Sequence, residues 1–309
     1  MQEYTKHYSV LKNEIIKFFS ESPSASEYYA DLTFGGGGHS FAIANTFPSS
    51  IIYATDQDEQ AYKNGLALIE KNNLAHRIHL KKTNFENFYN WIHGENLRIK
   101  FKGIVIDLGV SSHHFDDAER GFSFRKEARL DMRMNIDDKD SLTAYDIINS
   151  FAEEDLANIF FEYGEERLSR RIAANIIEKR KTEVIETTTQ LEDIVFHSYS
   201  KKYRFSKTHP ATRVFQALRI YINRELEVLE QSIPKLFDLL DKGGRLAIIS
   251  FHSLEDRIVK HQFKKIYQSN RELVKILTKR PMIPTQEELE ENNRSRSAKL
   301  RVIEKTTEG

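Results

Sequence analysis

A run of glycines follows the first strongly apolar segment of the chain. Asp31 stands before Gly35 and Gly37 with the spacing D-x-x-x-G-x-G. Glycines directly after a buried strand let the backbone turn sharply and approach a ligand, and the next helix offers backbone N–H groups. This spacing is typical of enzymes that use S-adenosyl-L-methionine, whereas the NAD pattern G-x-G-x-x-G fails because Ser40 stands at its last position. A plain tight turn is the alternative interpretation.

Asp56 lies at the end of the second apolar segment, 25 residues after Asp31. A carboxylate at this point can accept two hydrogen bonds from the ribose hydroxyls of a nucleotide-like ligand. The alternative is an N-cap for the helix expected from Gln57 onward, because aspartate also serves well in that position. We interpret Asp56 as the ribose ligand and Asp58 as the cap.

Asp107 ends a nearly all-apolar segment and is followed by Leu-Gly-Val-Ser-Ser. An exocyclic amine of a nucleobase is a poor nucleophile because it shares its lone pair with the ring. Hydrogen-bond acceptors on its N–H groups favour the pyramidal nitrogen that develops during methyl transfer. We predict that Asp107 is this acceptor or orients the methyl donor, with Ser111 or a loop carbonyl as the next candidate. A purely structural turn is the alternative.

Aromatic and imidazole side chains follow a later apolar segment, at residues 251 and 252. Ser253, followed by Leu-Glu-Asp, predicts the start of a helix with acidic residues in its positive first turn. Phe251 and His252 are also candidates to stack on, or hydrogen-bond to, a base that has left its stack. A single histidine is more often structural, so His252 is a substrate candidate only.

Two basic stretches are candidates to hold nucleic-acid phosphates. One combines four positive charges with small hydroxyl residues, and the other mixes positive charges with aromatic rings that can stack on bases. A solvated surface is the alternative for both. The first comprises Arg294, Arg296, Lys299 and Arg301, and the second comprises Arg120, Arg125, Lys126, Arg129 and Arg133 around Phe122 and Phe124.

Short apolar segments alternate with amphipathic ones and predict that a parallel α/β sheet positions these residues. The predicted strands are 28–32, 51–55, 77–82, 103–107, 245–250, 273–278 and 299–304. Helical spacing predominates between the fourth and fifth of these strands, with predicted helices at 141–181, 187–199 and 212–240. We therefore predict a Rossmann-like α/β domain formed by residues 1–114 and 213–309, with an inserted α-helical domain at residues 115–212.

Composition narrows the chemistry further. The chain has no cysteine, which excludes disulfides, thiolate zinc sites and a cysteine nucleophile. Enzymes that methylate carbon 5 of a pyrimidine commonly attack with a cysteine, so an exocyclic nitrogen or a hydroxyl is the better target here. Lys+Arg and Asp+Glu balance at 46 each, which neither supports nor excludes a nucleic-acid partner. Without a long apolar run or the pattern of a signal peptide, we expect a cytoplasmic protein that does not bind a membrane.

Several long segments resemble one enzyme family, the bacterial small-subunit ribosomal RNA cytosine-N4 methyltransferases (RsmH or MraW). The resemblance covers nearly the whole chain and includes HPATRVFQAL at 209–218 and SFHSLEDR at 250–257. It also includes residues 7–11, 31–40, 54–58, 107–112, 115–124, 130–134 and 294–301. It implies a class I methyltransferase core with an inserted helical substrate-recognition domain, and methylation of the N4 amine of one decoding-region cytidine.

The resemblance also implies which residues bind the methyl donor. By motif match these are Gly37, Gly38, His39, Asp56, Phe85, Asp107 and His114, and Gly35 joins them through its place in the glycine loop. Phe85 would lie near the adenine, although by sequence alone it is equally a core aromatic. The chain departs from the family at Ser111–His114, where the family usually has Ser-Ser-Pro-Gln, and at Gly36, where the family commonly has a charged or polar residue.

Our leading hypothesis is methyl transfer from S-adenosyl-L-methionine to a cytidine N4 in ribosomal RNA, without a metal. The expected partner is small-subunit ribosomal RNA or the small ribosomal subunit. The alternative is an RNA-binding ribosome-assembly factor with a vestigial cofactor fold. The glycine spacing disfavours a third interpretation, a nicotinamide-dependent oxidoreductase. The sequence leaves open whether the chain forms a homodimer.

Overall fold

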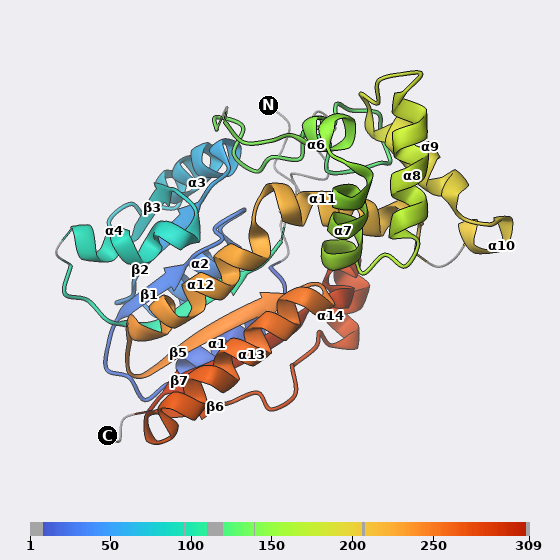
Figure 1. Cartoon of the computed structure of the whole chain (residues 1–309). Coiled ribbons are helices and arrows are strands. Elements are labelled where there is room, and N and C mark those ends of the chain that lie inside the picture. The colour runs from blue at the N-terminus through green and yellow to red at the C-terminus, as the bar shows by residue number, and fades with distance from the viewer. Residues whose placement is uncertain (1–8, 96, 110–119, 139, 206–207, 307–309) are drawn as a thin grey trace. The chain divides into compact units, whose positions relative to one another are not determined.

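The computed structural model describes residues 9–95, 97–109, 120–138, 140–205 and 208–306, apart from the side chain of Arg294. Its contacts divide the chain into two compact units (Figure 1). Unit 1 comprises residues 1–109 and 226–309, and unit 2 comprises residues 110–225. No helix among the described residues is long and apolar enough to cross a lipid bilayer.

Unit 1 is built on a seven-stranded sheet with the order β3-β2-β1-β4-β5-β7-β6. Neighbouring strands from β3 to β5 pair in parallel, whereas β7 is antiparallel to both β5 and β6. The strands are β1 (Tyr28–Asp31), β2 (Ile51–Asp56), β3 (Ile78–Lys82), β4 (Phe101–Asp107), β5 (Leu240–Ser250), β6 (Val274–Ile276) and β7 (Lys299–Lys305). Each predicted strand is present, most of them within a residue or two of the predicted ends.

Helices cover both faces of this sheet, which explains why its central strands are almost wholly apolar. In β4, Ile104 and Ile106 pack into one core with α4, α12 and α13, while Val105 between them packs into a second core with α1, α2 and α3. Figure 1 shows α12 and α13 crossing one face of the sheet. The helices are α1 (Lys12–Ser20), α2 (Gly38–Thr46), α3 (Glu59–Lys71), α4 (Phe88–Gly94), α12 (Glu225–Asp238), α13 (Ser253–Ser269) and α14 (Gln286–Glu291), with short 3-10 turns η1 (Phe85–Asn87), η3 (Arg271–Leu273) and η4 (Asn293–Ser297).

Three predicted elements differ from the structure. The helical segment expected at 141–181 is divided into helices at Ala144–Ser150, Glu153–Gly164 and Ser169–Arg180. The single helix expected at 212–240 is broken, because Arg224 has a positive φ of 49° and Asn223 bonds through its side chain to the carbonyl oxygens of Met132 and Arg219. The strand expected at 245–250 begins earlier, at Leu240, so that β5 includes Gly243, which has φ 78°, and the pairing with β4 shifts register there. An extra segment in one strand of a ladder is a bulge, so the apolar strand continues past its glycines.

Unit 2 is helical in its described part. Its helices are α6 (Ala144–Ser150), α7 (Glu153–Gly164), α8 (Ser169–Arg180), α9 (Thr188–Ser198), α10 (Lys201–Arg204) and α11 (Ala211–Ile222). Gly164 lets α7 approach α11 closely, since a Cβ at this position would lie 2.5 Å from the carbonyl oxygen of Arg213. The apolar faces of α6, α7, α8, α9 and α11 meet in one core, so unit 2 has a hydrophobic interior of its own.

Candidate functional site

The carboxyl ends of the parallel strands bring three aspartates to one edge of the sheet. Asp31 ends β1, Asp56 ends β2 and Asp107 ends β4. Because β1 lies between β2 and β4, the strand order reverses direction at β1. In open α/β sheets ligands bind outside the carboxyl ends of the strands at such a reversal. The fold therefore places the candidate site beside the loop that follows β1.

The glycine loop at this edge is shaped for a close approach of its backbone to a ligand. Gly35 and Gly37 have φ values of 50° and 75°, which favour glycine, and Gly37 is the N-cap of α2. A Cβ on Gly37 would lie 2.6 Å from ring atoms of both Phe34 and Phe41. The loop is a turn as in the alternative interpretation, but it also directs the first turn of α2 toward the sheet edge.

Asp31 has a structural task in this loop. Its Oδ2 accepts hydrogen bonds from the backbone N–H of Ser40 at 3.0 Å and from the Ser40 hydroxyl at 2.7 Å. Burial raises the pKa of the Asp31 carboxyl and the charge of Asp107 acts in the same direction, whereas His39 and the hydrogen bonds from Ser40 and Thr33 lower it. The contact to Ser40 fastens the start of α2 to the end of β1.

Asp56 reaches back across the sheet edge to the glycine loop. Its Oδ2 accepts the backbone N–H of Gly35 at 2.7 Å, and its Oδ1 accepts that of Asp58 at 2.9 Å. Asp58 caps α3 by accepting from the N–H groups of Gln60 and Ala61. The alternative of Asp56 as the cap is therefore wrong, and Asp58 is the cap as predicted. Each carboxylate oxygen can accept a second hydrogen bond, so the geometry is compatible with a ribose contact.

Asp107 faces the imidazole of His39. His39 Nε2 lies 3.7 Å from Asp107 Oδ2, and the backbone N–H of Asp107 donates to the Thr33 hydroxyl at 2.7 Å. Among the described residues no hydrogen-bond partner is found for the buried Oδ1 of Asp107, nor for either ring nitrogen of His39. Buried polar atoms normally have partners, so these three atoms mark a place where a ligand can supply them.

The charge of His39 depends on its acidic neighbours. Burial alone would lower the pKa of its imidazole, but the proximity and charge of Asp107 and the charge of Asp31 outweigh burial, and the pKa is raised. Lys12 acts weakly in the opposite direction. The carboxylates of Asp107 and Asp31 thus stabilise the protonated form of the His39 ring, and that form attracts β4 to the loop.

This arrangement predicts a pH-dependent contribution of His39 to stability. Below the pKa of an unfolded histidine the ion pair contributes fully, and the contribution disappears as the pH rises through the raised pKa of the folded state. We therefore expect His39→Gln to lower the free energy of unfolding more at about pH 6 than at about pH 9. Urea unfolding of both proteins measures this difference. An equal loss of stability at both pH values would contradict the ion pair.

The remaining predicted site residues are Gly38, Phe85, Ser111 and His114. Gly38 begins α2 and Phe85 begins η1. The Phe85 ring is half-buried and packs on the core beside α4, which fits both the adenine contact and the core aromatic. Ser111 and His114 lie outside the described residues, so their roles stay predictions from the sequence.

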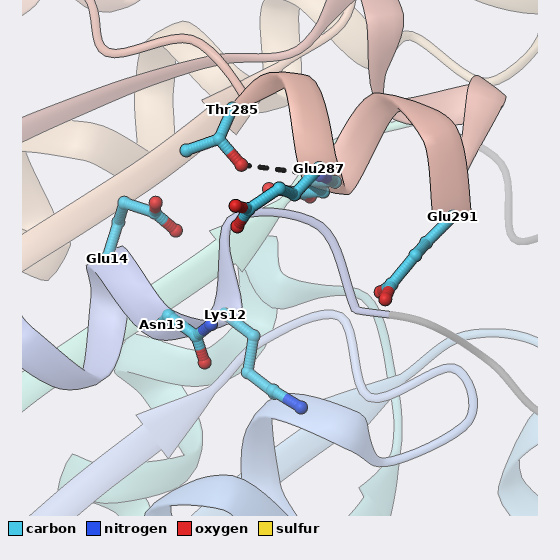
Figure 2. A pocket seen from close by; sticks show the side chains of 7 residues that line it. Lys12, Asn13, Glu14, Thr285, Glu287 and Glu291 are labelled. Atoms are coloured by element: carbon cyan, nitrogen blue, oxygen red, sulfur yellow. Dashed lines mark hydrogen bonds between the residues drawn. The ribbon is translucent and has the colours of Figure 1, made fainter.

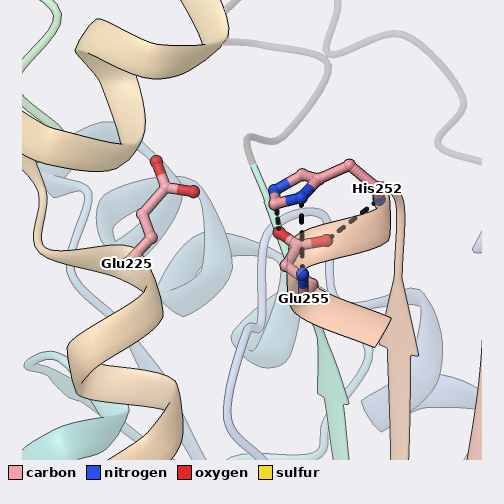
Figure 3. Close-up of side chains that lie close together, drawn as sticks. All are labelled: Glu225, His252 and Glu255. Carbon is pink, nitrogen blue, oxygen red and sulfur yellow. Dashed lines mark hydrogen bonds and ion pairs between the residues drawn. The ribbon is translucent and has the colours of Figure 1, made fainter. Parts of the chain in front are cut away.

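His252 has a structural role at the start of a helix. The helix α13 begins at Ser253 as expected, and His252 is its N-cap: Nδ1 accepts the backbone N–H of Glu255 at 3.4 Å. Figure 3 shows the ring beside the Glu255 carboxylate, with His252 Nε2 3.0 Å from Glu255 Oε1. Glu255 in turn accepts the N–H of Phe251 at 2.7 Å. These contacts favour the structural interpretation of His252 over a contact with substrate.

The predicted phosphate contact of Arg301 needs correction. Its side chain is buried in β7, and the guanidinium donates to both carboxylate oxygens of Asp256 in α13, at 2.6 and 3.2 Å. Burial raises the pKa of Asp256, but Arg301 and Lys299 outweigh it and the pKa is lowered. A buried, fully engaged guanidinium cannot track an RNA backbone, so we withdraw Arg301 from the predicted RNA contacts. Arg296 is exposed on η4, and the side chain of Arg294 lies outside the described part.

The second basic stretch, residues 120–133, contains arginines that bond within the protein and an arginine that is exposed. Arg120 is buried and donates to the carbonyl oxygens of Arg133 and Met134, while Phe122 is a core residue. Arg133 donates to both carboxylate oxygens of Asp131. Arg125 is exposed and, with Phe124, lines a hollow of about 590 Å³ in unit 2 together with Glu192, Thr208, His209 and Thr212. The sequence missed His209, whose separation from Phe124 along the chain gives no local signal.

A second hollow lies in unit 1 between α1 and α14 (Figure 2). It has a volume of about 320 Å³ and is lined by Glu14, Glu287, Glu288 and Glu291 with Lys12, Asn13 and Thr285. Glu288 is buried and accepts the backbone N–H of Leu11 at 2.8 Å, and burial raises the pKa of its carboxyl. The concentration of carboxylates makes this hollow unsuited to phosphate.

The fold and the site together define a class of enzyme. A Rossmann-like sheet whose last strand, β7, is antiparallel, with a glycine loop after β1 and acidic residues ending β2 and β4, is a class I S-adenosyl-L-methionine-dependent methyltransferase. The predicted fold class is confirmed.

Comparison with known proteins gives the family. The MraW methylase family matches residues 4–306. A ribosomal RNA small subunit methyltransferase H of Nostoc punctiforme is 50% identical over 97% of this chain and 94% of its own length. One of a Sulfurihydrogenibium species is 45% identical over 96% and 98%. A solved structure of a putative rRNA-methylase from Clostridium thermocellum aligns over 98% of this chain and 99% of its own, with 12% identity and a TM-score of 0.47.

The chain belongs to the MraW methylase family. This confirms the resemblance seen in the sequence, the prediction of a methyltransferase and the prediction of S-adenosyl-L-methionine as methyl donor.

Proposed function

We propose that this chain transfers a methyl group from S-adenosyl-L-methionine to the N4 amine of a decoding-region cytidine in small-subunit ribosomal RNA. The observation that supports this most is the buried Oδ1 of Asp107, which has no hydrogen-bond partner among the described residues and lies at the strand reversal beside the glycine loop. Such an acceptor suits an amine that must give up planarity and a proton. The absence of cysteine disfavours attack on ring carbon 5.

The residues of the site fit the donor. The positive φ values of Gly35 and Gly37 bring backbone N–H groups to the sheet edge, and Asp56 holds the loop through Gly35. We assign the ribose to Asp56, the adenine to Phe85, and the remaining contacts to Gly38, His39 and Asp107. When bound, S-adenosyl-L-methionine supplies an electrophilic methyl group on a positively charged sulfur, which the carboxylate of Asp107 favours electrostatically.

Asp107 would act on the target amine through a hydrogen bond. A carboxylate that accepts an N–H of the amine withdraws the nitrogen lone pair from the ring and orients it toward the methyl carbon. The new N–C bond would form as the S–C bond breaks and S-adenosyl-L-homocysteine leaves, and the nitrogen would then release one proton to water to restore a neutral amine. The other carboxylate oxygen faces His39, since Nε2 of His39 lies 3.7 Å from Asp107 Oδ2.

Unit 2, residues 110–225, covers the predicted insertion at 115–212, and we assign substrate recognition to it. We place the enzyme in the cytoplasm, where its proposed substrate is found, and the homodimer stays a prediction.

Nucleoside mass analysis tests the proposed function. Small-subunit RNA from cells lacking the gene, supplied naked or within the small subunit, is incubated with the protein and a donor carrying a labelled methyl group. We expect label in N4-methylcytidine at one position. Label in another nucleoside would contradict the amine assignment. Calorimetry with the donor distinguishes the alternative, because a ribosome-assembly factor with a vestigial fold would show no binding.

A further inference from the structure

Four aromatic side chains of unit 2 form a connected group, which we call the aromatic platform: Phe124, Phe196, Phe205 and His209. The His209 ring stacks on Phe124 with centroids 4.7 Å apart and an angle of 23°, and on Phe196 with centroids 5.8 Å apart and an angle of 15°. Phe205 meets Phe196 edge-on at 5.8 Å. The members come from four separate places in the chain, so only folding assembles them.

Core packing and polar contacts fix the positions of Phe124 and His209 in the platform. Phe124 packs edge-on against the core residue Phe215 at 5.2 Å. His209 Nδ1 accepts the backbone N–H of Ala211 at 3.3 Å, and Nε2 lies 3.3 Å from Glu192 Oε1. These two contacts fix the tautomer, because an Nδ1 that accepts leaves the proton on Nε2. A ring fixed in orientation loses little conformational freedom when a flat ligand stacks on it.

Part of the platform is exposed to solvent. Phe205 is 86% exposed, the largest value for any apolar side chain in the described part of the chain. The hollow of about 590 Å³ opens beside Phe124 and His209 and is lined otherwise by polar groups, Arg125, Glu192, Thr208 and Thr212. The platform thus offers one exposed ring at Phe205 and, beside Phe124 and His209, a polar hollow, which together suit a ligand with flat faces and polar edges better than an apolar peptide.

Positive charges surround the platform. The guanidinium of Arg204 lies 5.3 Å from the centre of the Phe196 ring and is held by the carbonyl oxygens of Tyr199 and His197. Arg125, Lys201 and Lys202 are exposed nearby in the chain. The acids at this surface are engaged: Glu192 with His209, and Asp193 with His197 at 3.0 Å. Rings interleaved with cations match the alternating bases and phosphates of an unpaired strand.

We propose that the aromatic platform binds bases of single-stranded RNA by stacking, with Arg125 and Arg204 positioned for adjacent phosphates. The identification of the strand as ribosomal RNA rests on the proposed function. The stacking itself rests on the rings, the hollow and the charges of unit 2. The platform thus adds an RNA-binding site outside the donor site at the sheet edge.

The test is fluorescence anisotropy of a labelled single-stranded oligoribonucleotide with the full chain. Phe205→Ala should weaken binding by about 5- to 100-fold, because one stacked base is lost. The matched control is Phe161→Ala, which removes a ring that is 62% exposed on α7 but outside the platform, and which should bind as the wild type does. Equal affinities of the two variants would overturn the proposal.

Two further variants separate stacking from simple apolar contact and from bulk charge. Phe205→Tyr should bind as the wild type does and Phe205→Leu should not; full RNA affinity of Phe205→Leu would overturn the stacking and show that any apolar side chain suffices at this position. Arg125→Gln should reduce the slope of log Kd against log salt by about 0.7, the value for one contact with a single strand. An unchanged slope would remove Arg125 from the site.

The outcomes for the proposed function are distinct. If the wild type methylates cytidine N4 and Phe205→Ala binds RNA normally, only the platform is overturned. If the wild type binds RNA through Phe205 but methylates no RNA, the platform stands and the proposed function fails.

Discussion

Replacing Asp107 with alanine should slow methyl transfer by about 100- to 1,000-fold, the usual effect of removing one preorganised group that acts on the transition state. The carboxylate is the only part of Asp107 that changes, since its backbone N–H would still donate to Thr33. The measurement is the single-turnover rate at saturating donor, with donor affinity determined separately by calorimetry. A variant that binds donor normally and reacts slowly has lost a contact to the reacting amine.

Two controls make this result specific. Asp107→Asn keeps the shape of the side chain but replaces one acceptor oxygen with a donor, so it should also be slow. Asp155→Ala changes an exposed acid on α7 in unit 2 and should react at the wild-type rate. A full rate for Asp107→Ala would show that Asp107 is a structural turn and would leave Ser111 as the next candidate.

Replacing Asp56 with alanine should weaken binding of S-adenosyl-L-methionine by about 1.5–3 kcal/mol, because hydrogen bonds to a charged acceptor are lost. The loss would include the contact that holds the Gly35 N–H at 2.7 Å. Calorimetric titration with donor measures the effect.

Asp58 is a matched control for Asp56, two residues further along the chain. Asp58→Ala removes the cap of α3 and should cost about 0.5–2 kcal/mol of stability while leaving donor affinity nearly unchanged. Asp56→Ala should therefore lower the affinity for the donor, whereas Asp58→Ala should lower the free energy of unfolding. An unchanged donor affinity of Asp56→Ala would show that Asp56 only fastens the loop.

The sequence predicted the sheet and its edge well because both follow from local pattern. A strand covered on both faces is a short apolar run, and the residue that ends it is at the carboxyl edge whatever its partners are. Asp31, Asp56 and Asp107 were therefore placed correctly before their neighbours were known. The cap at Asp58 was also a local matter, since it depends on the next three residues.

The assignments of Arg301 and His252 depended on side-chain contacts that only the folded structure shows. Arg301 belongs to a segment dense in positive charge, but its partner Asp256 lies 45 residues earlier, and nothing local indicates that pairing. His252 was a candidate for substrate because the sequence does not show that Glu255 folds back onto its ring. The sequence also did not predict the aromatic platform, because Phe124, Phe196 and His209 come into contact only in the folded chain.

The position of β7 between β5 and β6 has a consequence for the order in which the sheet forms. At its edge β6 hydrogen-bonds to β7, yet β7 follows it in the chain, so β6 cannot join the sheet until the later strand has already docked on β5. The ladder between β4 and β5 has a similar requirement, because all of unit 2 separates them. Closing such long loops costs conformational entropy before the strand pairs can stabilise them, and this slows folding. Assembly of the donor-binding sheet is thus governed by its least local pair, β4 with β5, and the rate of folding depends on how fast these two strands meet.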